Sequence, residues 1–105
     1  MTPSGARYFE LIWDFFGSDA AETAAHFHRH LLQRFQEQPA LAKGLVEDKV
    51  VEVRPGHAVV VCLLPEAEAR AVSTALRPRR GGPIEAEELR ERRARATERD
   101  ARSSS

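Results

Sequence analysis

The chain is poor in several residue types, and each shortage excludes a class of protein. Its 105 residues include a single cysteine, Cys62, which excludes an internal disulfide and a zinc site built on cysteines. Sixteen basic residues balance sixteen acidic ones, and this net charge of zero disfavours a strongly basic nucleic-acid-binding protein. No apolar run approaches the roughly 20 residues of a membrane span, and the N-terminus lacks a signal-peptide pattern. We therefore expect a cytoplasmic protein with a reduced thiol.

The remaining composition is that of an ordinary globular protein. Hydrophobic residues make up 42% of the chain and charged residues 30%, and 105 residues suffice for one small core. Arginine outnumbers lysine 14 to 2, which is typical of a GC-rich bacterial coding sequence and does not by itself indicate phosphate binding. Nearly all large apolar side chains fall within residues 1–78. We therefore predict a single α+β domain over 1–78 and a charged, flexible or frayed-helical tail over 79–105.

Residues 8–16 show the alternation of a β-strand. Aromatic and branched side chains are frequent there, and Gly17 ends the run. Because successive side chains of a strand point to opposite faces, the two faces can be assigned. One face is expected to pack against helices, with Trp13 largely buried. It carries Phe9, Leu11, Trp13 and Phe15, and the opposite face carries Glu10, Ile12, Asp14 and Phe16.

A helix, a hairpin and a second helix follow. Residues 19–38 have apolar side chains at helical spacing, and two valine-rich runs, 49–53 and 58–64, flank a Pro-Gly pair that suits a type II turn. A further helix is expected over 65–77. This order predicts an α+β, ferredoxin-like split βαββα fold. Its antiparallel sheet would have three strands in the order 1-3-2, with both helices on one face.

The tail and the predicted sheet together indicate self-association. Pairs such as Glu88 and Arg92 at i,i+4 favour a helix in the tail, but its only large apolar residues are Ile84 and Leu89, so it is poorly suited to cover a sheet. The first strand would keep an open edge, and the outer sheet face would expose apolar side chains. We therefore expect a homodimer formed through the first strand or the outer sheet face, without a membrane partner.

Glu10 and Asp14 are candidates for acid–base chemistry. Both are expected on the outer face of the first strand, where the hairpin register could bring His57 next to them, and an Asp–His pair in a pocket can transfer protons. A carboxylate in solvent or at an interface is the alternative. The sequence contains no nucleophile elbow, phosphate loop or dinucleotide motif. Cys62 lies in an apolar strand and is expected to be inert.

Histidines in the first predicted helix are candidates for metal binding. Glu22, His26 and His30 follow one another at intervals of four, which can bring a carboxylate and two imidazoles to one side of a helix. Such a set suits a partial transition-metal site, and ordinary solvated histidines are the alternative. His28 lies at the edge of the apolar stripe and is expected to be half-buried. No cofactor is predicted.

Basic residues also cluster where the second predicted helix ends. The helix dipole favours cations at this place, where the sequence has Arg77, Arg79 and Arg80. Nucleic-acid binding by these arginines is not expected, because the tail has no aromatic residues that could stack on bases. The sequence as a whole favours a homodimeric interaction or regulatory module. The alternatives are a small enzyme or ligand-binding protein of the dimeric α+β type, using Asp14, Glu10 and a histidine, and metal binding through the histidine helix. Whether the chain is an enzyme stays open.

Overall fold

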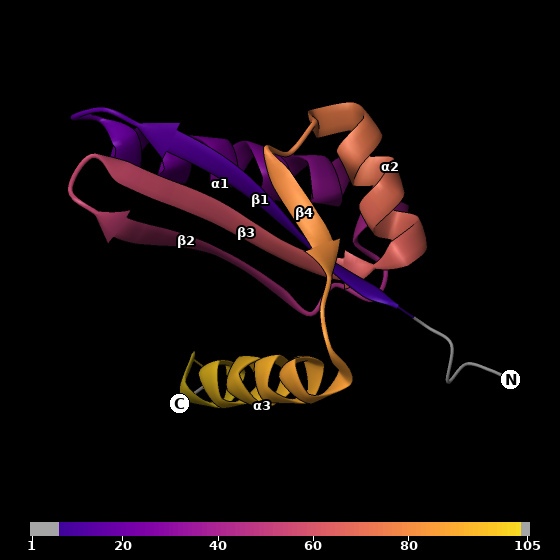
Figure 1. Cartoon of the computed structure of the whole chain (residues 1–105). Helices are drawn as coiled ribbons and strands as arrows, with labels where there is room; N and C mark the ends of the chain where they lie inside the picture. The colour runs from indigo at the N-terminus through magenta and orange to yellow at the C-terminus, as the bar shows by residue number, and fades with distance from the viewer. Residues whose placement is uncertain (1–6, 104–105) are drawn as a thin grey trace, which may run out of the picture.

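The computed structural model of the chain describes the backbone of residues 7–103 and the side chains of residues 7–96. Figure 1 labels the helices and strands along the chain. None of the helices within the described residues is long and apolar enough to cross a membrane. The elements are β1 (Tyr8–Phe16), α1 (Ala20–Glu37), the 3-10 helix η2 (Pro39–Ala42), β2 (Glu47–Arg54), β3 (His57–Pro65), α2 (Glu66–Leu76), β4 (Arg80–Pro83) and α3 (Ala86–Ser103).

The strands form one antiparallel sheet in the order β2-β3-β1-β4. The first three strands stand in the predicted order, but the prediction of three strands is wrong, because β4 pairs with β1 along Phe9–Ile12. The sequence of β4 has no apolar alternation that would predict a strand. Gly81 approaches β1 so closely that a Cβ atom there would lie 3.2 Å from the carbonyl oxygen of Glu10. β4 therefore forms by backbone pairing without an apolar pattern, and it covers part of the edge that was expected to be open.

The β2–β3 hairpin reverses at the predicted Pro-Gly pair. Gly56 has a φ of 86°, a conformation that glycine adopts without steric cost. A β-bulge between Glu52 and Arg54 leaves Val53 as an additional residue in β2. The backbone N–H of Gly17 donates a hydrogen bond of 2.9 Å to the carbonyl oxygen of Gly56, so the end of β1 lies beside the turn. We call this end of the sheet the hairpin end.

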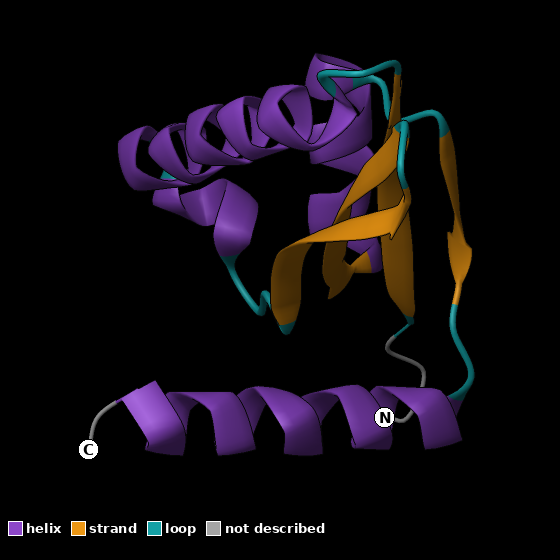
Figure 2. Ribbon diagram, turned by 90° about the vertical axis from the view of Figure 1, so that its left-hand side faces the viewer, coloured by secondary structure: helices purple, strands orange, loops and turns teal. Residues whose placement is uncertain are grey.

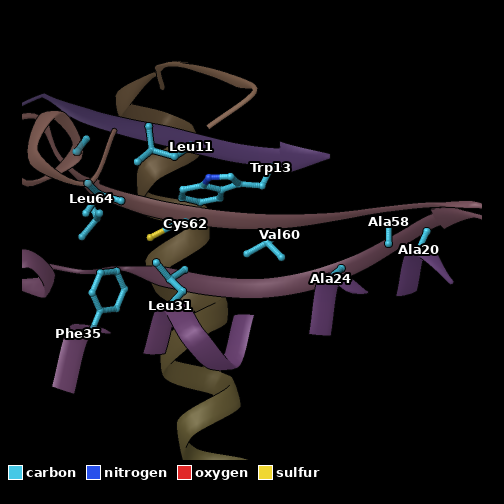
Figure 3. Close-up of a cluster of buried hydrophobic side chains, with 12 residues drawn as sticks. Leu11, Trp13, Ala20, Ala24, Leu31, Phe35, Ala58, Val60, Cys62 and Leu64 are labelled. Atoms are coloured by element: carbon cyan, nitrogen blue, oxygen red, sulfur yellow. The ribbon is translucent and has the colours of Figure 1, made fainter. Parts of the chain in front are cut away.

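The core lies between the sheet and the helices α1 and α2, and Figure 3 shows part of it. Trp13 is 5% exposed, as predicted, and its indole N–H donates a hydrogen bond of 3.0 Å to the carbonyl oxygen of Leu76. Cys62 is buried, and burial raises its pKa to about 12, so its thiol is unreactive. The other members are Leu11, Ala20, Ala24, Leu31, Phe35, Ala58, Val60, Leu64, Ala69 and Val72.

The opposite, outer face of the sheet meets α3, which lies below the sheet in Figures 1 and 2. The register of β1 and β3 places Ile12, Phe16 and Leu63 on this face, as predicted for β1. Leu63 is fully buried, whereas Phe16 at the hairpin end is 65% exposed. Contacts between α3 and the sheet run through Arg92, at the end of the face away from the hairpin, and through Arg93, which donates a hydrogen bond of 2.8 Å to the hydroxyl of Tyr8. The charged helix therefore docks through polar side chains although it lacks an apolar stripe.

Candidate functional site

Three side chains meet at the hairpin end of the outer face, and two of them are predicted candidates. Asp14 of β1 accepts a hydrogen bond of 2.8 Å from Nε2 of His57, which begins β3. Arg80, the first residue of β4, donates to the same carboxylate from Nε at 3.0 Å and from Nη2 at 2.9 Å. We call Asp14, His57 and Arg80 the Asp14 cluster. One carboxylate thus joins three strands.

Asp14 is nearly buried, because its side chain is only 6% exposed. The bidentate hydrogen bond from Arg80 lowers the pKa of Asp14 below its ordinary value of 3.8 and outweighs the opposite effect of burial. The hydrogen bond from His57 acts in the same direction. In turn, the hydrogen bond to Asp14 raises the pKa of Arg80. The pair therefore remains charged over the whole neutral range.

His57 is held on two sides. Its Nε2–H points to Asp14, which leaves Nδ1 as the ring nitrogen that can accept a proton. Its ring stacks on Phe16, with centroids 4.5 Å apart and planes at 13°. An Asp–His pair in this orientation can act as a general base. Within the described residues, however, no hydroxyl or thiol is hydrogen-bonded to this imidazole, so the pair has no nucleophile in place.

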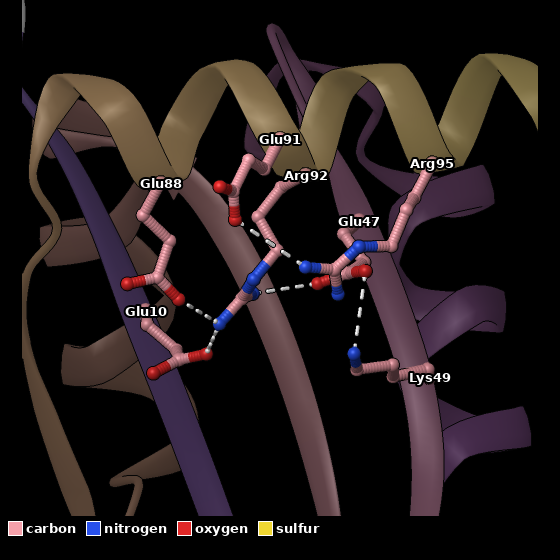
Figure 4. Close-up of polar contacts among 7 residues, drawn as sticks. All are labelled: Glu10, Glu47, Lys49, Glu88, Glu91, Arg92 and Arg95. Carbon is pink, nitrogen blue, oxygen red and sulfur yellow. Dashed lines mark hydrogen bonds and ion pairs between the residues drawn. The ribbon is translucent and has the colours of Figure 1, made fainter.

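Glu10 belongs to a different cluster, at the other end of the outer face (Figure 4). Arg92 of α3 donates hydrogen bonds to Glu10 at 2.6 Å, to Glu47 of β2 at 2.7 Å and to Glu88 at 2.8 Å. The ammonium of Lys49 lies 3.3 Å from Glu47. We call these five residues the Arg92 cluster. Glu10 is therefore bound by Arg92 and not by the predicted partner His57.

Burial makes the Arg92 cluster a structural anchor. Arg92 is 8% exposed and Glu47 is 3% exposed. Burial alone would lower the pKa of Arg92, but hydrogen bonds and charge from the surrounding carboxylates outweigh it, so the pKa is raised and the guanidinium stays charged. A buried charge without partners would carry a large desolvation cost. The mutual pairing of these charges thus fixes α3 over the sheet.

The predicted metal ligands lie on α1. Nε2 of His26 and Nε2 of His30 are 3.1 Å apart, and both residues are exposed. Glu22 does not complete a cluster with them, because the described residues contain no group of three or more His, Cys, Asp or Glu side chains able to hold a metal ion. His28 is half-buried, as predicted, and bonds to Asp48 of β2 at 2.7 Å.

Two open cavities lie on the helix-covered side of the sheet. One, of about 450 Å³, lies beside α1 and the end of α2 and is lined by Phe27, Leu31 and Leu76 among others. The other, of about 440 Å³, lies beside α2, β1 and β4, where Phe9 and Leu11 form part of its wall. Neither is lined by a residue of the Asp14 cluster. The Asp–His pair therefore lies outside both cavities.

The sequence alone does not reveal the roles of the two arginines that organise these clusters. Its pattern places Arg80 with the cations at the end of a helix, whereas β4 places it beside Asp14. Arg92 gave one local signal, its spacing from Glu88, and that pair is confirmed at 2.8 Å. Its contacts with Glu10 and Glu47 join residues 82 and 45 positions apart, which no local pattern can reveal.

Comparison with known proteins finds no matching family model, no matching curated protein and no matching solved structure. The function is therefore argued from the geometry of the chain itself.

Proposed function

We propose that this chain is a homodimeric interaction or regulatory module with a ferredoxin-like fold, and that the edge strand β2 is its self-association surface. The observation that carries this proposal is the exposure of two valines on β2: Val51 is 36% and Val53 is 53% exposed. Among the described residues, the other exposed large hydrophobic side chain is Phe16. Phe16 lies on β1, where it stacks on His57 and stays exposed outside that contact.

β2 is the long free edge of the sheet. On the other edge, β4 pairs with β1 along Phe9–Ile12, whereas β2 has β3 on one side and no further strand of the described chain on the other. An eight-residue edge strand presents a row of backbone N–H and C=O groups that can accept another strand. The expected dimer contact at β1 is thereby partly occupied within the chain. We accordingly assign the contact to β2.

Val51, near the middle of β2, fits pairing with a second copy of this chain. Two copies related by a two-fold axis would pair their β2 strands antiparallel. A register centred on Val51 sets valine against valine at the axis. Like charges directly opposite one another destabilise a strand pair, so a charge placed at this position should separate the two copies.

Val51→Lys tests the assignment. The wild-type protein is expected to have about twice the chain mass of 11.8 kDa when light scattering follows size-exclusion chromatography at micromolar concentration. Val51→Lys is expected to be monomeric, because two ammonium groups would meet at the axis. Val51→Thr is the matched control, since it keeps the β-branched shape without a charge, and it should remain dimeric. A dimeric Val51→Lys variant would contradict the role of β2.

Phe16→Lys separates the edge from the outer face. It adds a charge to the same face of the sheet, but on β1, so a dimer formed through β2 should tolerate it. Both substituted positions are exposed in the monomer, so each variant should fold. If Phe16→Lys dissociates the dimer, the dimer uses the outer face and the assignment to β2 is wrong.

The Asp14 cluster supports a second candidate function, that of a small enzyme or ligand-binding protein. The observation in its favour is the 2.8 Å contact between Asp14 and His57, which leaves Nδ1 of His57 available as a base. The cluster lies on the sheet face and lines neither of the two larger cavities, so we place this function second. An acid–base activity that His57→Gln abolishes and Val51→Lys retains would favour the enzyme over the interaction module.

A further inference from the structure

We propose that His26 and His30 form a two-histidine site for a divalent transition-metal ion on the exposed side of α1. Their rings are one helical turn apart and meet edge to face, with centroids 4.5 Å apart. The Nε2 atoms point at each other across 3.1 Å. This inference does not depend on the proposed function, because neither histidine lies on β2.

The distance between the two nitrogens matches the distance between two imidazole nitrogens that bind one metal ion. Zinc binds imidazole nitrogen at about 2.0–2.1 Å, so two nitrogens on one ion are about 3.3–3.4 Å apart at a tetrahedral angle and about 2.8–3.0 Å apart at a right angle. The observed 3.1 Å lies between these values. An ion can therefore replace the hydrogen bond between the rings without a change in the backbone of α1. Histidines at i,i+4 on one helix are an established way to hold zinc.

The surroundings limit the site to two protein ligands. An open hollow beside His26 is lined also by Asp19, Glu22, Thr23 and Arg29. Its carboxylates favour a cation nearby, but none joins the two histidines as a third ligand within the described residues. Water would complete the coordination. Imidazole ligands select zinc, copper and nickel over magnesium and calcium, and we therefore infer a late first-row ion.

Arg29 opposes metal binding at this site. Its Nη2 lies 3.4 Å from Nδ1 of His26, which makes Nδ1 an acceptor and leaves the proton on Nε2. To bind a metal through Nε2, His26 must carry its proton on Nδ1 and lose this contact. The guanidinium charge also repels a cation. Removing Arg29 should therefore strengthen metal binding, an effect that chance binding elsewhere on the surface would not show.

The test is calorimetric titration of the untagged, full-length protein with zinc chloride. We expect one ion per chain, bound in the micromolar range, and no heat from magnesium chloride. His30→Gln should weaken zinc binding at least about tenfold, since the loss of a ligand should cost no less than the 10–100-fold typical of an outer-shell partner. Arg29→Gln should tighten it. His28→Gln is the control, because His28 is bound to Asp48, and it should leave zinc affinity unchanged.

Two results would overturn the site. The first is zinc binding by the wild-type protein weaker than about 1 mM. The second is equal zinc affinity in the wild type and His30→Gln. His26, Arg29 and His30 are exposed on α1, so these variants should fold, and circular dichroism can verify it.

Discussion

Asp14 joins three strands through one carboxylate, because His57 belongs to β3 and Arg80 to β4. The strand alternation could place Asp14 on the outer face, and the hairpin could offer His57 as a neighbour. Arg80 could not be assigned, because its contact depends on a strand that carries no side-chain pattern. At the scale of residues, the sequence therefore allowed the Asp–His pair to be predicted but not the arginine that keeps it charged.

The lowered pKa of Asp14 predicts how its contribution to stability depends on pH. The carboxyl binds protons more weakly in the folded than in the unfolded chain, so its stabilising effect is complete above the ordinary value of 3.8 and is lost as the pH falls through the lower folded value. Asp14→Asn should thus reduce the free energy of unfolding more at about pH 6 than at about pH 2.5. Urea denaturation at both pH values measures this, and an equal reduction at both would argue against the charged cluster.

Arg92→Ala should destabilise the fold by about 3–5 kcal/mol, because it removes the guanidinium that binds both Glu10 and the buried Glu47. The matched control is Arg95→Ala on the same helix. Arg95 is 58% exposed and lies 3.6 Å from Glu91, so its loss should cost less than about 1 kcal/mol. Thermal and urea denaturation compare the two. Similar losses from both variants would mean that Arg92 does not anchor α3.

Trp13→Ala tests the core on the helix-covered face. Trp13 is 5% exposed and packs against Phe27 with ring centroids 5.0 Å apart. Its removal should cost about 3–5 kcal/mol and unfold most molecules of so small a domain. Trp13→Phe keeps most of the volume and loses the hydrogen bond to Leu76, so it should cost clearly less. An unchanged melting temperature and an unchanged urea midpoint in Trp13→Ala would contradict this packing.

At the scale of elements, the parts that could be predicted are those whose side chains repeat with a period. β1 shows the period of a strand, α1 that of a helix, and the Pro-Gly turn marks the hairpin. β4 could not be predicted, since Arg80–Pro83 has the sequence of a chain breaker and pairs with β1 without an apolar side-chain pattern. α3 could be predicted as a helix but not as a docked one, because its contact with the sheet rests on Arg92 and Arg93 and not on an apolar stripe.

At the scale of the whole molecule, the helices and β4 that cover the sheet determine which surface stays accessible to a partner. α1 and α2 cover the inner face of the sheet, α3 meets one end of the outer face, and β4 covers part of the β1 edge. β2 remains, with Val51 and Val53 exposed along it. A regulatory module that works as a pair of chains would use this edge, because it can pair with its own copy.

Light scattering on the wild-type protein across a dilution series tests this account most directly. We predict a mass near twice 11.8 kDa at high micromolar concentration, falling toward the monomer on dilution as mass action requires. The apparent melting temperature should fall in parallel, because dimerisation stabilises the folded chain. A mass of 11.8 kDa at every concentration, with a melting temperature that does not change on dilution, would contradict the homodimeric module.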